Sequence, residues 1–107
     1  MPSTFNYDPI TTAKNLAAFA LNNNVDGIDV NWNDNFAFSN GNAEKWLIRF
    51  TIAFRNEAPM LIITHSPKAS YFSDSISYPF GGYNEINRQV GSFISFYSLI
   101  YYGNSAT

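Results

Sequence analysis

Residues 25–34 read Val-Asp-Gly-Ile-Asp-Val-Asn-Trp-Asn-Asp. Branched apolar side chains are frequent in this segment, which favours a β-strand over residues 25–32. Because alternate side chains of a strand point to opposite faces, three apolar residues share one face: Ile28, Val30 and Trp32. The opposite face carries Asp29, Asn31 and Asn33. We expect the apolar face to pack under a helix and Asp29 to be a lone carboxylate on the polar face.

Helical patterns lie on both sides of this strand. Asp8 followed by Pro9 predicts a helix start, and the asparagines at 22–24 predict its end. A second helix is predicted over residues 43–56, with a buried stripe of Ala43, Trp46, Leu47, Phe50 and Phe54 that Ile48 and Ile52 widen. A third is expected over 83–90, and further strands over 60–65 and 94–102. This alternation predicts an α/β fold with a parallel sheet and right-handed crossovers.

Composition favours one globular domain spanning residues 1–107. The chain has 107 residues, of which 46% are apolar and only 13% charged, so it has enough apolar surface to form a core. The net charge of −2 and the scattered Lys and Arg residues argue against nucleic-acid binding. No apolar run approaches the ~20 residues of a membrane span, and no signal peptide is visible, so we expect a cytoplasmic location by default.

The 25–34 segment resembles the catalytic strand of the family 18 glycoside hydrolases, the chitinases and endo-N-acetylglucosaminidases. The signature of that family runs Asp-x-x-Asp-x-Asp-x-Glu. Residues 8–21, 43–48, 61–67 and 90–104 also resemble neighbouring helices and strands of the family, in particular of its fungal members. The resemblance implies part of a (β/α)8 barrel, with three strands that correspond to the fourth, fifth and sixth of the barrel.

Two acidic positions of the signature carry amides here. The resemblance places Asp26 and Asp29 on the first and second aspartates, Asn31 on the third, and Asn33 on the catalytic glutamate. Tyr102 falls on a tyrosine of the sixth strand that supports the substrate's acetamido group. An amide has no proton that it can lose and regain near neutral pH, so Asn33 cannot be a general acid. These five positions are therefore expected to be a vestigial catalytic site.

Length is the second departure from the family. A closed barrel needs about 250 residues, whereas three strands leave two open edges and an uncovered inner face. We expect self-association, most simply as a two-fold homodimer, to cover them.

Several side chains are candidates for glycan binding. His65, the single histidine, is predicted to end a strand, where ligand sites in parallel sheets gather. Tyr71 and Phe72, in the predicted loop 66–82, could stack on sugar rings. The full predicted carbohydrate-binding set is Asp29, Asn31, Asn33, His65, Tyr71, Phe72 and Tyr102. With no cysteine and one histidine we expect no metal site, and we expect no cofactor.

Three functions remain open on the sequence. The first is a catalytically inactive, lectin-like protein for glycans that contain N-acetylglucosamine, such as chitin oligosaccharides or an N-glycan core. The second is a structural, self-assembling barrel fragment whose old active site is vestigial. The third is a residual glycoside hydrolase.

Overall fold

A computed structural model describes residues 8–31, 37–38, 40–72 and 78–99. Helices and strands alternate along the chain as predicted. The main elements are α1 (Pro9–Asn22), β1 (Gly27–Val30), α3 (Asn42–Glu57), β2 (Ile62–His65), α4 (Gly82–Val90) and β3 (Phe96–Tyr97). Two short 3-10 helices, η1 (Ala69–Phe72) and η2 (Gly91–Phe93), flank α4 in the sequence.

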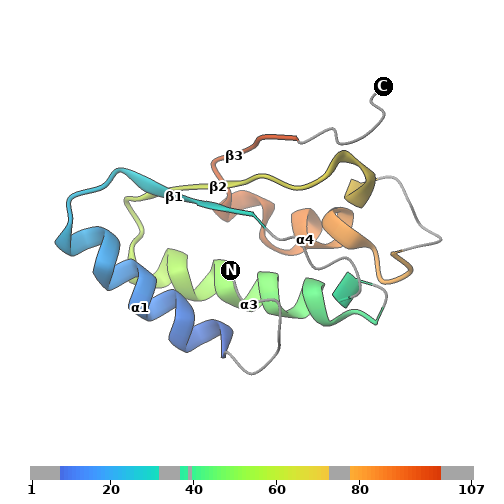
Figure 1. Ribbon diagram of the computed structural model, residues 1–107, viewed down its shortest axis with the longest axis horizontal. Coiled ribbons are helices and arrows are strands. Elements are labelled where there is room, and N and C mark those ends of the chain that lie inside the picture. The colour runs from blue at the N-terminus through green and yellow to red at the C-terminus, as the bar shows by residue number, and fades with distance from the viewer. Residues whose placement is uncertain (1–7, 32–36, 39, 73–77, 100–107) are drawn as a thin grey trace.

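The three strands form one parallel sheet in the order β1-β2-β3. The helices α1, α3 and α4 lie on the same side of this sheet (Figure 1). The sheet is not closed, and the fold is a small α/β unit with three parallel strands and three main helices. This confirms the predicted fold class. Within the described residues the strands are shorter than predicted: β1 covers residues 27–30 of the expected 25–32, and β3 covers 96–97 of the expected 94–102. Residues 32 and 100–102 of these predicted strands lie outside the described part of the chain.

Helix α1 begins and ends at the residues that the sequence indicates. The Asp8 carboxylate accepts a hydrogen bond from the Thr11 backbone N–H at 2.7 Å, which caps the helix. Beyond its end, Asn24 has a φ of 57°, the left-handed conformation that asparagine tolerates. Small buried residues let α1 approach the core closely: Ala13, Ala17 and Ala20.

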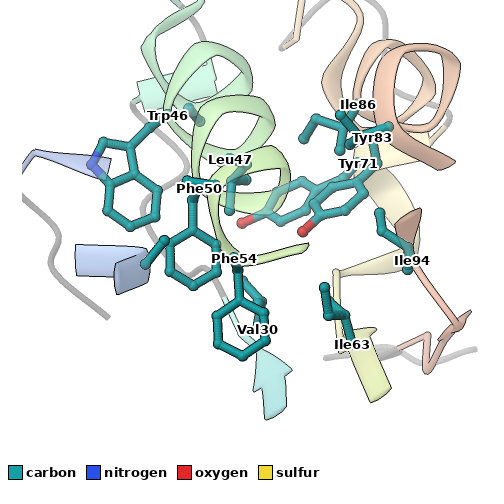
Figure 2. Close-up of a cluster of buried hydrophobic side chains, with 14 of the residues drawn as sticks. Val30, Trp46, Leu47, Phe50, Phe54, Ile63, Tyr71, Tyr83, Ile86 and Ile94 are labelled. Atoms are coloured by element: carbon teal, nitrogen blue, oxygen red, sulfur yellow. The ribbon is translucent and has the colours of Figure 1, made fainter. Parts of the chain in front are cut away.

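Helix α3 contributes more residues to the buried core than any other described element. The predicted stripe is confirmed, because Ala43, Trp46, Leu47, Phe50 and Phe54 are all buried. Figure 2 shows one buried cluster that joins four α3 side chains (Trp46, Leu47, Phe50 and Phe54) to Val30 of β1, Ile63 of β2, and Tyr83 and Ile86 of α4. Ile52, which was expected to widen the stripe, is 39% exposed on the outer side of the helix.

One arginine joins the end of α3 to the strands. The Arg55 guanidinium donates to the carbonyl oxygen of Leu61 at 2.6 Å and to that of Phe93 at 2.7 Å. It also reaches the carbonyls of Ala58 and Pro59, at 3.4 and 3.1 Å. Its five donors in a fixed plane let one side chain bind carbonyls of the segment between α3 and β2 and of η2 at the same time.

A carboxylate is buried at the other end of α3. Glu44 is 3% exposed, and its Oε2 accepts a hydrogen bond from the Gly82 N–H, in the first residue of α4, at 2.8 Å. Its Oε1 has no hydrogen-bond partner among the described residues. Burial raises the pKa of Glu44 above its usual value. Glu44 therefore ties α3 to α4 at the cost of burying an incompletely paired acid.

We predict that Gly27→Ala destabilises the fold. A Cβ at residue 27 would collide with the backbone carbonyl of Ile62 on β2, so the two strands would have to separate. Overpacking of this kind costs about 1–3 kcal/mol, which urea denaturation would measure.

The matched control is Gly91→Ala. Residue 91 has an ordinary right-handed φ of −57°, and its new Cβ would meet only the end of the Asn87 side chain. This variant should lose much less stability than Gly27→Ala. Equal losses in the two variants would contradict the close strand approach at Gly27.

Candidate functional site on the open face of the sheet

The side of the sheet that faces away from the helices carries polar groups around Asp29. In the register of β1 and β2, Asp29 lies beside Thr64. Alternation therefore places Gly27 and Asp29 of β1 on the same face as Ile62 and Thr64 of β2. We call this side, defined by these four residues together with Asn31, Ser66 and Phe96, the open face.

Two hydroxyl groups hold the Asp29 carboxylate in place. The Thr64 hydroxyl donates to Oδ1 at 2.6 Å, and the Ser66 hydroxyl lies 2.7 Å from Oδ1 and 2.8 Å from Oδ2. Short hydrogen bonds to a charged acceptor are among the stronger ones in proteins. Asp29 is nevertheless exposed, so its remaining lone pairs face solvent. We call these three residues the Asp29 clamp.

An amide side chain follows the Asp29 clamp in the sequence. Asn31 is exposed and follows β1 directly, two residues after Asp29. Asp26 is also exposed, but it precedes β1, and its backbone carbonyl accepts a hydrogen bond from Ile62 N–H at 2.9 Å. Asn33 and Tyr102, the other two predicted positions of the old catalytic site, lie outside the described residues.

His65 does not join the open face, which corrects the predicted binding set. It follows Thr64 in β2, so its side chain points to the opposite side, among the helices, where it is 0% exposed. Its Nδ1 lies 2.6 Å from the Tyr83 hydroxyl, and its Nε2 lies 3.4 Å from the Thr51 hydroxyl. Burial lowers the pKa of His65 from 6.5 to about 4, and the Asp29 charge opposes this shift.

The two loop aromatics are also placed differently from the expectation. Tyr71 is buried and packs against Phe38, with ring centroids 4.4 Å apart. Its ring is nearly parallel to that of Tyr83, at 8° and 6.2 Å, and Figure 2 shows the two side by side. Phe72 is half-buried against Tyr83 and Tyr97. The ring of Tyr71 lies in the core, because η1 packs against α4.

The sequence prediction missed Thr64 and Ser66. Side chains of a strand alternate between its two faces, so the segment Thr64-His65-Ser66 places both hydroxyls on the face opposite to His65. The prediction considered the position of His65 at the strand end but not the direction of its side chain.

A cavity lies elsewhere, on the outer side of the helices. It has a volume of about 340 Å³ between α1 and α3, and its lining includes Ile10, Lys14, Arg49, Ile52, Asn56 and Glu57. None of these residues belongs to the open face, so the cavity and the Asp29 clamp are separate features. Among the described residues no group of three or more His, Cys, Asp or Glu side chains could hold a metal ion. None of the described helices is long and apolar enough to cross a membrane.

Comparison with solved structures identifies the architecture. A GH18 chitinase from Pseudoalteromonas aurantia superimposes with a TM-score of 0.81 and 30% sequence identity over 92% of this chain. The chain has a chitinase-like fold, that of a segment of a GH18 barrel. It spans 36% of the length of that chitinase. No family model matches the chain, and no curated protein matches it either.

We predict that His65 makes stability depend on pH. Because the folded protein holds His65 neutral, with a pKa of about 4 against 6.5 in the unfolded chain, its contribution is complete above pH 6.5. It is lost as the pH falls from 6.5 toward 4, by on the order of 3 kcal/mol in total. Urea denaturation between pH 7.5 and 5 would measure the loss.

His65 is the chain's single histidine, which makes the comparison with His65→Gln direct. The variant should be less stable at pH 7, but its free energy of unfolding should change little from pH 6.5 to 5. The same dependence of the free energy of unfolding on pH in both proteins would show that the folded protein does not hold His65 neutral.

Proposed function

We propose that this chain is a catalytically inactive relative of the family 18 glycoside hydrolases that binds glycans containing N-acetylglucosamine through its open face. Its membership of the family is supported by the 30% identity and TM-score of 0.81 with the Pseudoalteromonas chitinase. The observation that carries the proposal is the Asp29 clamp: a solvent-facing carboxylate fixed by two hydroxyls, with an amide two residues away.

The chemistry of this group suits binding better than hydrolysis. A fixed carboxylate accepts hydrogen bonds from sugar hydroxyls or from an acetamide N–H. Asn31 can both donate and accept, so it can pair with either kind of group. Hydrolysis with the help of the substrate's acetamide needs a proton donor near the glycosidic oxygen. Asn33 replaces the family's donor in sequence, and no other acid of the open face lies beside Asp29 among the described residues.

We predict that chitotriose binds and is not cleaved. Asp29→Asn should weaken binding about tenfold or more, because hydrogen bonds to a charged group contribute about 1.5–3 kcal/mol. Calorimetric titration measures the affinity, and a chromogenic chitobioside measures cleavage.

Glu57→Gln is the matched control, since it removes the same charge from an exposed residue at the end of α3, away from the open face. It should leave the affinity unchanged. Flat heats at millimolar chitotriose would refute glycan binding. Turnover of the chitobioside that Asp29→Asn abolishes would refute inactivity and favour a residual hydrolase.

Self-assembly is the second candidate, and the apolar part of the open face favours it. Phe96 is 60% exposed and Ile62 is 46% exposed, next to the clamp. In the described sheet β1 and β3 each have one unpaired edge. We propose that a second copy of the chain covers these groups, since exposed apolar sheet faces and edges promote association.

This second candidate predicts a homodimer of about twice 12.0 kDa at micromolar concentration, measured by size-exclusion chromatography with light scattering. Phe96→Asp should give a 12.0 kDa species, because it puts a charge into the contact. Phe80→Asp is the control: that side chain is 57% exposed but lies just before α4, away from the sheet. A wild-type protein of 12.0 kDa would refute the dimer.

A further inference from the structure

Three consecutive residues at the end of β2 contribute side chains to both faces of the sheet: Thr64, His65 and Ser66. Thr64 and Ser66 hold Asp29 on the open face, and His65 between them is fixed among the helices. A backbone rotation at residue 65 would therefore move both hydroxyls of the clamp. The β2–β3 ladder also involves His65, because its carbonyl accepts a hydrogen bond from Ser98 N–H at 2.9 Å.

The hydrogen bonds of His65 specify one tautomer. Thr51 donates its hydroxyl proton to the Leu47 carbonyl at 2.7 Å, so its oxygen is left to accept. The Nε2 of His65 must then carry the proton and donate to Thr51 over 3.4 Å. Its Nδ1 is consequently an acceptor, and Tyr83 donates to it at 2.6 Å. Burial raises the pKa of Tyr83 well above its ordinary value, so the phenol keeps its proton.

These contacts join β2 to two helices. Thr51 belongs to α3 and Tyr83 to α4, and each reaches a different nitrogen of the same ring. The ring also packs edge-on against Tyr97 of β3, with centroids 6.3 Å apart. Among the described groups, the titratable ones around His65 are Tyr83 from α4, Tyr97 from β3 and, through the sheet, Asp29 from β1.

We propose that His65 is a positioning residue for the Asp29 clamp. By binding Tyr83 and Thr51 in its neutral form, it fixes the end of β2 so that the hydroxyls of Thr64 and Ser66 remain on Asp29. When Nδ1 gains a proton it can no longer accept from Tyr83, and the clamp loosens. The consequence for glycan affinity rests on the proposed function, whereas the link from Tyr83 to Asp29 does not.

Tyr83→Phe tests this link because it removes one hydroxyl and keeps the ring. Tyr97→Phe is the matched control, since the Tyr97 hydroxyl donates to Asn87 at 2.9 Å, whereas Tyr97 contacts His65 through its ring. Nuclear magnetic resonance at pH 7 gives the tautomer of His65 from its ring nitrogens. The Asp29 carboxyl carbon and the Ser66 side chain report on the clamp in the same samples.

We expect the Nε2–H tautomer in the wild type. Tyr83→Phe should shift the signals of His65, Asp29 and Ser66 together, and Tyr97→Phe should leave those of Asp29 and Ser66 in place. Loss of a hydrogen bond to the neutral ring should also make His65 take up its proton at a higher pH in Tyr83→Phe. Chitotriose affinity should fall by about threefold or more as His65 becomes charged. In Tyr83→Phe this fall should occur at the same higher pH at which His65 takes up its proton.

Two results separate this proposal from the proposed function. If Tyr83→Phe changes the His65 signals while Asp29 and Ser66 stay unchanged, or if the wild type holds the other tautomer, the positioning role is wrong. If the clamp signals move as expected but no protein binds chitotriose at any pH, the positioning role stands and glycan binding is refuted.

Discussion

Two short parallel strands, Gly27–Val30 and Ile62–His65, send alternate side chains to opposite sides, and the described helices cover only one of those sides. Val30, Ile63 and His65 therefore lie in the core. Asp29 and Thr64 take the other side, where the Asp29 clamp forms. The remaining structure depends on this separation, because a shift of one residue in either strand would exchange the two sets.

The covered side is stabilised by large aromatic residues and by a few polar contacts that join elements. Helix α3 contributes the buried stripe, and Arg55 and Glu44 tie its two ends to neighbouring segments. His65 has a similar joining role in the middle of the sheet. Because buried polar groups are costly unless paired, each of these residues specifies one arrangement of the elements that it contacts.

The order of elements and the core of α3 could be predicted from the sequence, since both follow from the period of the apolar residues and from strong local signals such as Asp8 before Pro9. The face on which Asp29 lies followed from the same alternation, but its exposure did not, because the sequence does not show what covers that face. The burial of Tyr71 could not be predicted, because its partners Phe38 and Tyr83 are brought to it by tertiary packing. The position of His65 at a strand end suggests a site residue. Because its neighbours Thr64 and Ser66 lie on the open face, alternation places His65 on the opposite face.

The proposed function places glycan binding on the open face of the sheet. The most direct measurement is a map of backbone amide chemical shifts during titration with chitotriose. We expect changes that centre on Gly27, Asp29, Thr64 and Ser66 and leave α1 and the outer side of α3 unaffected. Changes confined to the helices, or to the cavity that Lys14 and Arg49 line, would contradict it.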